Sequence, residues 1–302
     1  MAAWVAEVAR VEVARGRRGG GGRVIHPAGS KVVLVIQAHA DDATIWCGGQ
    51  VIKWAQAGWR VVLVRAPNDE NASVGLDREA TVRTNEEEFR RGAALLGAAE
   101  VVSLGFRDGL LTDSARIPLR DQLIHLYRKF RPYATVSFDP YSTLFENNQD
   151  HLVVARAADE AFWMAMGAKY VPTDLDSGLG LHGVFERWYF GRRLPEVSEW
   201  VDISDVMDAK IEAATAQATM MWDTLHQLEL MSRTAGVSIP RFPPADGDLR
   251  PLVEVLLKSS DGPAGSRHGC AFAEEFRTVR FAALSGSQTG LLEGQETTRS
   301  GD

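Results

Sequence analysis

Short apolar runs alternate with longer helix-like stretches along this chain, and this alternation restricts it to a small set of folds. The first run, Val32-Val33-Leu34-Val35-Ile36, has the character of a buried strand. Similar runs follow at residues 59–64, 100–104 and 135–138, and helical patterns occupy residues 48–57, 82–96, 119–130 and 151–166. Strand–helix alternation of this kind predicts a Rossmann-like α/β fold, with a doubly wound, mostly parallel sheet and helices on both faces.

The second half of the chain follows a different pattern. Residues 184–190 indicate a strand, residues 206–230 one long helix, and residues 272–281 a closing strand. We interpret these elements as C-terminal additions that complete the core and wall the site. Residues 31–284 are therefore expected to form a single domain. A flexible N-terminal extension at 1–30 and a disordered tail at 285–302 are expected on either side, from their glycine-rich and polar compositions.

The composition excludes several classes of protein. With 302 residues, 45% hydrophobic and 24% charged, the chain resembles an ordinary soluble globular protein. Its formal net charge of −7 argues against a general nucleic-acid binder, which would carry a basic patch. Cys47 and Cys270 belong to no CxxC pair, which argues against a thiolate zinc site and a disulfide framework. No apolar run reaches the roughly 20 residues of a membrane helix, and residues 1–18 make a poor secretory signal, so we expect a cytoplasmic location.

Residues suited to metal chemistry come directly after the first strand. The stretch is His39-Ala40-Asp41-Asp42, at the place where ligands bind in open α/β sheets. An imidazole and a carboxylate suit a divalent ion such as zinc, and residues three apart in a turn that opens a helix face the same side. We therefore expect His39 and Asp42 to be metal ligands and Asp41 to be free as a general base. The alternative is that one of the aspartates only caps the helix.

A catalytic zinc needs a third protein ligand and an open position for water. The best candidate is His151, which follows the fourth predicted strand through a polar loop and would begin the next helix. That loop emerges from the same edge of the sheet as His39. Taken alone, His151 could be an ordinary residue of a helix start, but two such elements at strand ends favour a metal site.

Several blocks of the sequence, in order, resemble the LmbE-like, or PIG-L-type, zinc-dependent N-acetylglucosamine deacetylases. Ala38-His39-Ala40-Asp41-Asp42 with Gly48-Gly49 resembles that family's AHPDD…GG signature. Asn148-Gln149-Asp150-His151 resembles its second block, commonly His-Pro-Asp-His. The other similar blocks, within residues 31–282, are Arg83 and Glu88 before Leu96-Gly97, the LGxxDG-like stretch at 104–109, and residues 186–190, 201–204 and 273–277.

The resemblance implies one Zn²⁺ per chain, held by His39, Asp42 and His151, with Asp41 as the general base for the attacking water. It implies a hydrolase that removes the acetyl group of an N-acetylglucosamine-type conjugate and releases acetate and a free amine. Asp150 would then orient His151, because metal-binding imidazoles usually donate their other N–H to a supporting group. Its alternative role is that of an acidic residue favoured at a helix N-terminus.

Two positions depart from the family pattern. Ala40 stands where proline is usual, which loosens the loop but removes no chemistry. Asn148 stands where many members carry a histidine thought to protonate the leaving amine or to hold the oxyanion. Asparagine can donate a hydrogen bond to an oxyanion but cannot deliver a proton at neutral pH. We therefore expect Asp41 to return its proton to the amine, with His268 as the alternative donor.

The candidate substrate-binding residues are Arg83, Arg107 and Asp108. Asp108 follows the third predicted strand, where a carboxylate would suit vicinal sugar hydroxyls, and its alternative role is a structural turn with Gly109. Arg107 would bind an anionic part of the substrate or pair with a surface acid.

The expected partner is a small N-acetyl amino-sugar conjugate, with no nucleic acid and no membrane, and formation of a homo-oligomer stays open. An amidase on a larger thiol or natural-product conjugate is an alternative within the same family, because loop shape and not fold sets the substrate. A non-catalytic sugar- or nucleotide-binding module on a Rossmann-like sheet is a third hypothesis. It has little support, because the loop after the first strand lacks GxGxxG and a P-loop Lys-Ser/Thr.

Overall fold

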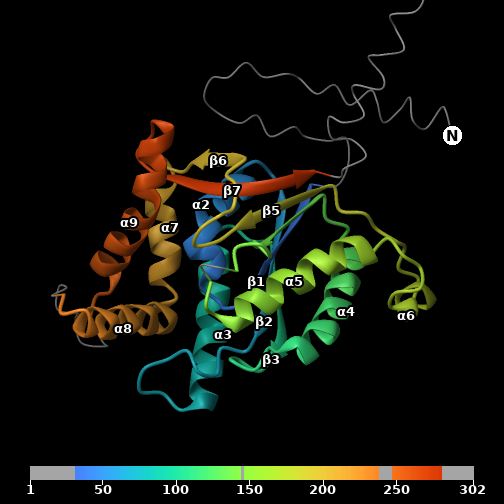
Figure 1. Ribbon diagram of the computed structural model, residues 1–302, viewed down its shortest axis with the longest axis horizontal. Coiled ribbons are helices and arrows are strands. Elements are labelled where there is room, and N and C mark those ends of the chain that lie inside the picture. The colour runs from blue at the N-terminus through green and yellow to red at the C-terminus, as the bar shows by residue number, and fades with distance from the viewer. Residues whose placement is uncertain (1–30, 144–145, 238–246, 281–302) are drawn as a thin grey trace, which may run out of the picture.

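The computed structural model describes residues 31–143, 146–237 and 247–280, and in these ranges one mixed sheet forms the centre of the molecule (Figure 1). Its seven strands lie in the order β3-β2-β1-β4-β5-β7-β6. The strands are β1 (Val32–Gln37), β2 (Arg60–Pro67), β3 (Glu100–Phe106), β4 (Ala134–Phe138), β5 (Glu186–Phe190), β6 (Glu199–Asp202) and β7 (Ala273–Arg280). The first five strands are parallel, and β7 pairs antiparallel with both β5 and β6. The predicted mostly parallel α/β sheet is confirmed.

Helices cover both faces of this sheet because the central strands are apolar on both sides. Val33 and Val35 of β1 face one core, and Leu34 and Ile36 face the other. The first core is closed by α2, α3, α7, α8 and α9, and the second by α4 and α5, which lie side by side in Figure 1. The helices are α2 (Asp42–Gln56), α3 (Arg78–Leu95), α4 (Asp113–Phe130), α5 (Gln149–Met164), α6 (Pro172–Asp176), α7 (Met207–Thr215), α8 (Ala218–Thr234) and α9 (Arg250–His268).

The strand order places the functional edge of the sheet. The chain runs outward from β1 to β2 and β3, then returns to place β4 on the other side of β1. Ligands in open α/β sheets bind outside the carboxyl ends of the strands where the order reverses in this way. The loops that follow β1 and β4 therefore lie next to each other, as the two polar loops of the sequence require.

Apart from the short helix α6, which was not predicted, the helices differ from the prediction in two main places. The single helix expected over 206–230 is wrong: it is two helices, α7 and α8, separated at Ala216 and Gln217. Gln217 has non-helical angles (φ −98, ψ 51), and its buried amide donates to the carbonyl oxygen of Ala40 at 2.7 Å. This contact across the molecule outweighs the continuous helical pattern of the local sequence.

The other difference is α9, which was not expected. Its sequence contains Pro263, Gly262 and Gly265, which are poor helix formers. Gly265 is needed because a side-chain carbon there would lie 2.6 Å from the backbone of Ala271. Close packing of α9 against the turn into β7 therefore requires glycine at position 265, although glycine is a poor helix former.

The predicted terminal segments lie outside the part of the chain that the structure describes. Residues 1–30 and 281–302, including the predicted extension and tail, lie outside the described residues. Within the described ranges, no helix combines the length and the apolar character that crossing a membrane requires.

Candidate active site

Three side chains converge at the carboxyl ends of β1 and β4. His39 comes from the loop after β1, Asp42 is the first residue of α2, and His151 lies in the first turn of α5. His39 Nδ1 lies 3.0 Å from His151 Nε2, and Asp42 lies 3.4 Å from His151 Nε2 and 3.8 Å from His39 Nδ1. One ligand atom from each of the three residues falls within a 4.8 Å group. The structure thus brings together the three residues predicted from sequence as ligands, and their donor set suits a divalent ion.

The ring nitrogens that point away from this group also face carboxylates. His39 Nε2 lies 3.4 Å from Asp108 and 3.9 Å from Asp150. His151 Nδ1 lies 3.0 Å from Glu146. The expectation that Asp150 orients His151 is therefore wrong. Asp150 accepts backbone N–H groups from residues 109 and 111 and lies on the side of His39.

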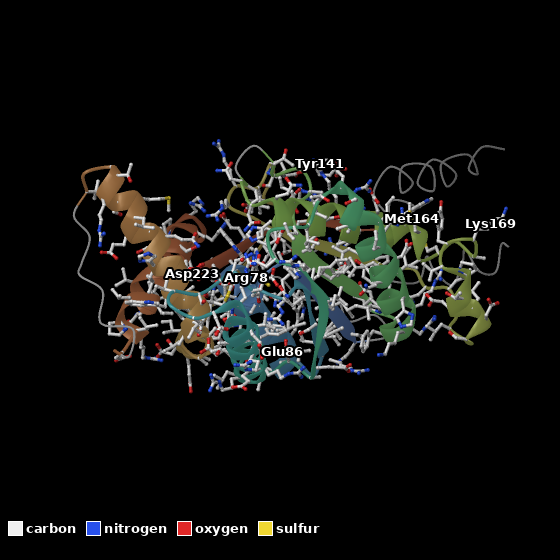
Figure 2. The ribbon with its side chains drawn as sticks, turned by 90° about the horizontal axis from the view of Figure 1, so that it is seen from below. Arg78, Glu86, Tyr141, Met164, Lys169 and Asp223 are labelled. Atoms are coloured by element: carbon white, nitrogen blue, oxygen red, sulfur yellow. The ribbon has the colours of Figure 1, made fainter. Side chains whose placement is uncertain are left out.

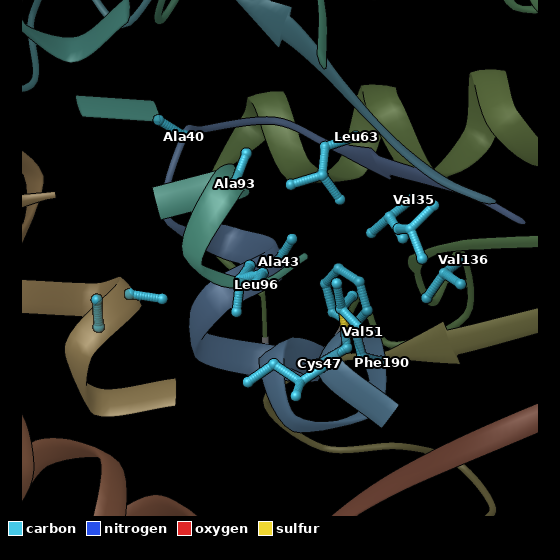
Figure 3. Close-up of a cluster of buried hydrophobic side chains, with 14 of the residues drawn as sticks. Val35, Ala40, Ala43, Cys47, Val51, Leu63, Ala93, Leu96, Val136 and Phe190 are labelled. Atoms are coloured by element: carbon cyan, nitrogen blue, oxygen red, sulfur yellow. The ribbon is translucent and has the colours of Figure 1, made fainter. Parts of the chain in front are cut away.

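Hydrogen bonds fix the loop that carries His39. The Asp42 carboxylate accepts from the backbone N–H of His39 at 2.7 Å, and Gln37 accepts from the N–H of Ala43 at 2.8 Å. The N–H of Ala40 donates to Asp69 at 3.2 Å. The Ala40 side chain itself is buried in the core beside α2 and α3, as Figure 3 shows. Backbone bonds and an apolar anchor thus hold the loop where a proline was expected to stiffen it.

Asp41 stands at the N-cap position of α2 without acting as a cap. Its backbone is helical (φ −91, ψ −15), and its side chain makes no capping hydrogen bond. The residue is buried, with 5% of its surface exposed. The carboxylate of Asp41 therefore does not cap the helix, which argues against the capping alternative for this residue.

The charge balance of the site favours a bound cation. Buried carboxylates surround the two imidazoles: Asp41, Asp42, Asp69, Asp108, Glu146 and Asp150. Burial alone would lower the pKa of His39, but Asp108, Asp42 and Asp69 raise it to about 10. Burial raises the pKa of Asp41 to about 7, and the charge of Asp42 adds to the effect. Without a cation the cluster must take up protons to limit its negative charge, so a divalent ion fits the residues present.

Asp69 is a site residue that the sequence reasoning missed. It follows β2, is fully buried, and has a left-handed backbone with φ of 56°. Its carboxylate accepts from Arg65 at 2.9 Å as well as from Ala40. Burial raises its pKa to about 6, although Arg65 and His39 oppose the shift. A non-glycine residue with positive φ costs about 1–3 kcal/mol, and such residues cluster at functional sites. The signal was a polar Asn-Asp-Glu-Asn run after the second strand.

The remaining predicted site residues lie at different distances from the three ligands. Asp108 is buried against His39 and accepts from the N–H of Asn71 at 3.0 Å. Asn148 is the N-cap of α5, and its side-chain oxygen accepts from the N–H of Asp150 at 2.9 Å. The ligand loop, Asp108 and Asn148 thus share one end of the sheet.

Three other candidates are engaged elsewhere. Arg83 is 61% exposed on α3 and bonds to Glu79 one turn away. Arg107 is 58% exposed and pairs with Glu70 at 2.7 Å. His268 stacks on Trp200 and lies 2.8 Å from Glu275. The structure does not bring Arg83 or His268 to the three ligands, and it leaves Arg107 on an exposed loop beside Asp108.

Helix α8 approaches the site from outside the sheet. Its residue Asp223, labelled in Figure 2, has a pKa raised mainly by burial. Gln217, which directly precedes α8, donates to the carbonyl oxygen of Ala40 in the ligand loop. The C-terminal additions thus contact the loop that carries His39.

A cavity of about 640 Å³ lies between α2, the segment after β5, α9 and β7. Trp46 of α2, Arg192 after β5, and parts of α9 and β7 line it. Arg192 lies over the Trp46 ring, 5.9 Å from its centre, and 3.3 Å from Glu146. Glu146 in turn faces His151, so Arg192 and Glu146 lie between the cavity and the ligand group, and no proposed ligand lines the cavity.

The sequence and the fold are similar to those of known proteins. Residues 34–162 match the model of the family described as PIG-L, GlcNAc-PI de-N-acetylase. A diacetylchitobiose deacetylase from Thermococcus kodakarensis is 28% identical over 201 residues, which are 66% of this chain and 73% of that protein.

Solved structures share the fold. The N,N'-diacetylchitobiose deacetylase from Pyrococcus horikoshii, solved with its inhibitor MPG, aligns with a TM-score of 0.69 and 24% identity, over 83% of this chain and 84% of that one. The 4-carboxy-2-hydroxymuconate hydratase GalB from Pseudomonas putida KT2440 aligns with a TM-score of 0.55 and 20% identity, over 84% and 98% of the two chains. At these identities the likeness concerns the fold alone.

Proposed function

We propose, from the match of residues 34–162 to the PIG-L family model, that the protein is a metal-dependent N-deacetylase acting on an N-acetylglucosamine-type conjugate. The observation that carries the proposal is the convergence of His39, Asp42 and His151 within 4.8 Å, at the functional edge of the sheet. The deacetylase relative from Thermococcus kodakarensis supports the reaction type.

The metal of this site is proposed to be zinc, at one ion per chain. Two imidazoles and one carboxylate leave an open position on a four-coordinate ion, as catalytic zinc sites do. When bound, zinc would supply an activated water and a polarised acetamide carbonyl. His39 Nε2 faces Asp108 at 3.4 Å and Asp150 at 3.9 Å, and its Nδ1 faces His151 and Asp42.

Asp41 is proposed to be the general base. Its carboxylate is buried next to the ligands and is not used as a helix cap. It takes the proton of the attacking water and returns it to the nitrogen of the leaving amine. We assign the return of the proton to Asp41, because the amide of Asn148 can only donate a hydrogen bond to the developing oxyanion.

The substrate is held by groups at the rim of the site. Asp108 contacts His39, so its carboxylate positions that ligand and at the same time borders the space for the sugar. Arg107, which is exposed on the loop after β3, is the remaining candidate for a polar substrate group. We include no substrate role for Arg83, because it pairs with Glu79 on the exposed side of α3.

An amidase on a larger conjugate is the second candidate, because loop shape and not fold sets the substrate.

The test is a screen for amine release from N-acetylated amino sugars, their glycosides, and larger N-acyl conjugates. Zinc is added in one arm, and a chelator is the control. We expect zinc-dependent release of acetate and amine from at least one N-acetylglucosamine derivative. Release only from larger N-acyl conjugates would select the second candidate, and a protein that binds no zinc and releases no amine would contradict both.

A further inference from the structure

Glu146 is a buried carboxylate to which the proposed reaction gives no part. It lies on the connection from β4 to α5, with 5% of its surface exposed. One oxygen accepts the backbone N–H of Asn148 at 2.8 Å. The other lies 3.0 Å from His151 Nδ1 and 3.3 Å from Arg192 Nε. A buried charge needs such partners, and here one of them is a proposed metal ligand.

The two nitrogens of His151 have separate surroundings. Nε2 faces Asp42 and His39, and Nδ1 faces Glu146. Among the described residues, Nδ1 makes no well-aligned hydrogen bond, and the carboxylate of Glu146, 3.0 Å away, is the group that faces it. A neutral imidazole carries its proton on one nitrogen, and a carboxylate at Nδ1 favours the proton there. Nε2 is then left with its lone pair directed at the ligand group.

The ring plane of His151 is fixed by packing as well. Phe138, the last residue of β4, stacks on the imidazole with ring centres 4.0 Å apart and 17° between the planes. Stacking restrains tilt but leaves rotation within the plane free. The Glu146 carboxylate, 3.0 Å from Nδ1, opposes that remaining rotation.

The neighbouring carboxylate cannot take this part. Asp150 accepts the N–H of Gly109 at 2.7 Å and that of Leu111 at 3.2 Å, so both its oxygens are engaged on the other side of the site. Its nearest imidazole is that of His39, at 3.9 Å.

We infer that Glu146 is a positioning residue that sets the tautomer and orientation of His151 for metal binding, with Arg192 as its counter-charge. The inference rests on the proposed function only through the metal site. Arg192 is 55% exposed and lines the cavity beside Trp46. The wall of that cavity is thus linked to the ligand group through one ion pair.

The experiment compares zinc affinity of the metal-free proteins by competition with a chromophoric chelator. Glu146→Gln keeps the size of the side chain, and Glu146→Ala removes it. Partners of metal-binding histidines typically contribute about 10–100-fold in metal affinity, and we expect a loss of that size in both variants. Asn147→Ala changes the exposed neighbour and is the matched control, with unchanged affinity expected.

A readout other than affinity separates positioning from general stability. In the zinc-loaded wild type, the Nδ1–H proton of His151 should be shifted downfield in the ¹H NMR spectrum by the Glu146 carboxylate, and in zinc-loaded Glu146→Gln this shift should be smaller. Thermal unfolding of the metal-free variants shows whether they remain folded. A folded Glu146→Gln that binds zinc as tightly as Asn147→Ala would overturn the inference.

The outcome is independent of the reaction itself. If the wild type binds zinc but releases no amine from any conjugate, the proposed function fails, and the comparison of zinc affinities still decides the role of Glu146.

Discussion

Asp41 is the residue that separates metal binding from chemistry in the proposed site. It is adjacent to Asp42 in the chain, yet the two carboxylates have different surroundings. Asp42 contacts both imidazoles and the N–H of His39, whereas Asp41 is left without a cap bond. Two neighbouring aspartates can therefore serve as ligand and base.

We expect Asp41→Asn to retain one zinc per chain and to lose turnover by about 10²–10⁴-fold, the usual contribution of a general base. His151→Ala should lose the metal itself, because it removes one of three ligands. Metal content by atomic absorption and initial rates of amine release measure the two effects. Full activity of Asp41→Asn on the true substrate would show that another group is the base.

For individual residues, the sequence predicts roles that depend on neighbours along the chain, and it misses roles that depend on contacts with distant residues. His39, Asp41 and Asp42 follow one strand, and His151 follows another, so the parallel sheet alone brings them together. Glu146 and Asp69 could not be assigned, because their roles come from contacts with His151 and Ala40 that no local pattern encodes.

Among the elements, α2 depends on a strand near the other end of the described chain. The helix is kinked at Cys47 (φ −146, ψ 18), and just after the kink Gly49 and Gln50 donate their N–H groups to Glu274 of β7, each at 2.8 Å. Glu274 also binds the ammonium group of the fully buried Lys210 at 2.8 Å. Lys210 also binds Asp261 of α9 at 2.7 Å.

We expect Lys210→Met to destabilise the protein by about 3–5 kcal/mol, because it leaves two buried carboxylates without their cation. The free energy of unfolding in urea measures the effect. Lys53→Met is the matched control, since Lys53 pairs with the exposed Asp205 and should contribute about 0–1 kcal/mol. Equal stabilities of the two variants would show that the buried cluster adds nothing to folding.

Elements were predictable where periodicity and packing agree. The strands of the parallel sheet are apolar runs bounded by polar turns, and the structure has them within a few residues of the prediction. The break at Gln217 and the helix α9 were missed because contacts with Ala40 and Ala271 override local preference there.

In the whole molecule, the site is a cluster of acidic side chains to which both halves of the fold contribute. Loops after β1, β2, β3 and β4 carry its carboxylates, and Gln217, between α7 and α8, bonds to the ligand loop. Repulsion among these carboxylates opposes folding unless a cation or protons are taken up. Metal binding and stability are therefore coupled in this protein.

We expect saturating zinc to raise the melting temperature by several degrees and a chelator to reverse the rise. A ligand at 100 times its Kd stabilises the folded state by about 2.7 kcal/mol. Differential scanning calorimetry with and without zinc measures the shift, and His151→Ala should show little of it. A wild-type melting temperature that does not respond to zinc would argue against a metal in the folded site.

The contact between Glu274 and α2 bears on how this protein can be dissected. The segment matched by the family, residues 34–162, contains the three proposed ligands and the proposed base, and it invites use as a minimal catalytic fragment. Such a fragment would lack β7, and with it the carboxylate that receives the N–H groups of Gly49 and Gln50. The ligands are encoded in the first half of the chain, but the helix that carries Asp42 is completed by its second half, so truncation, circular permutation and domain grafting must keep the two together.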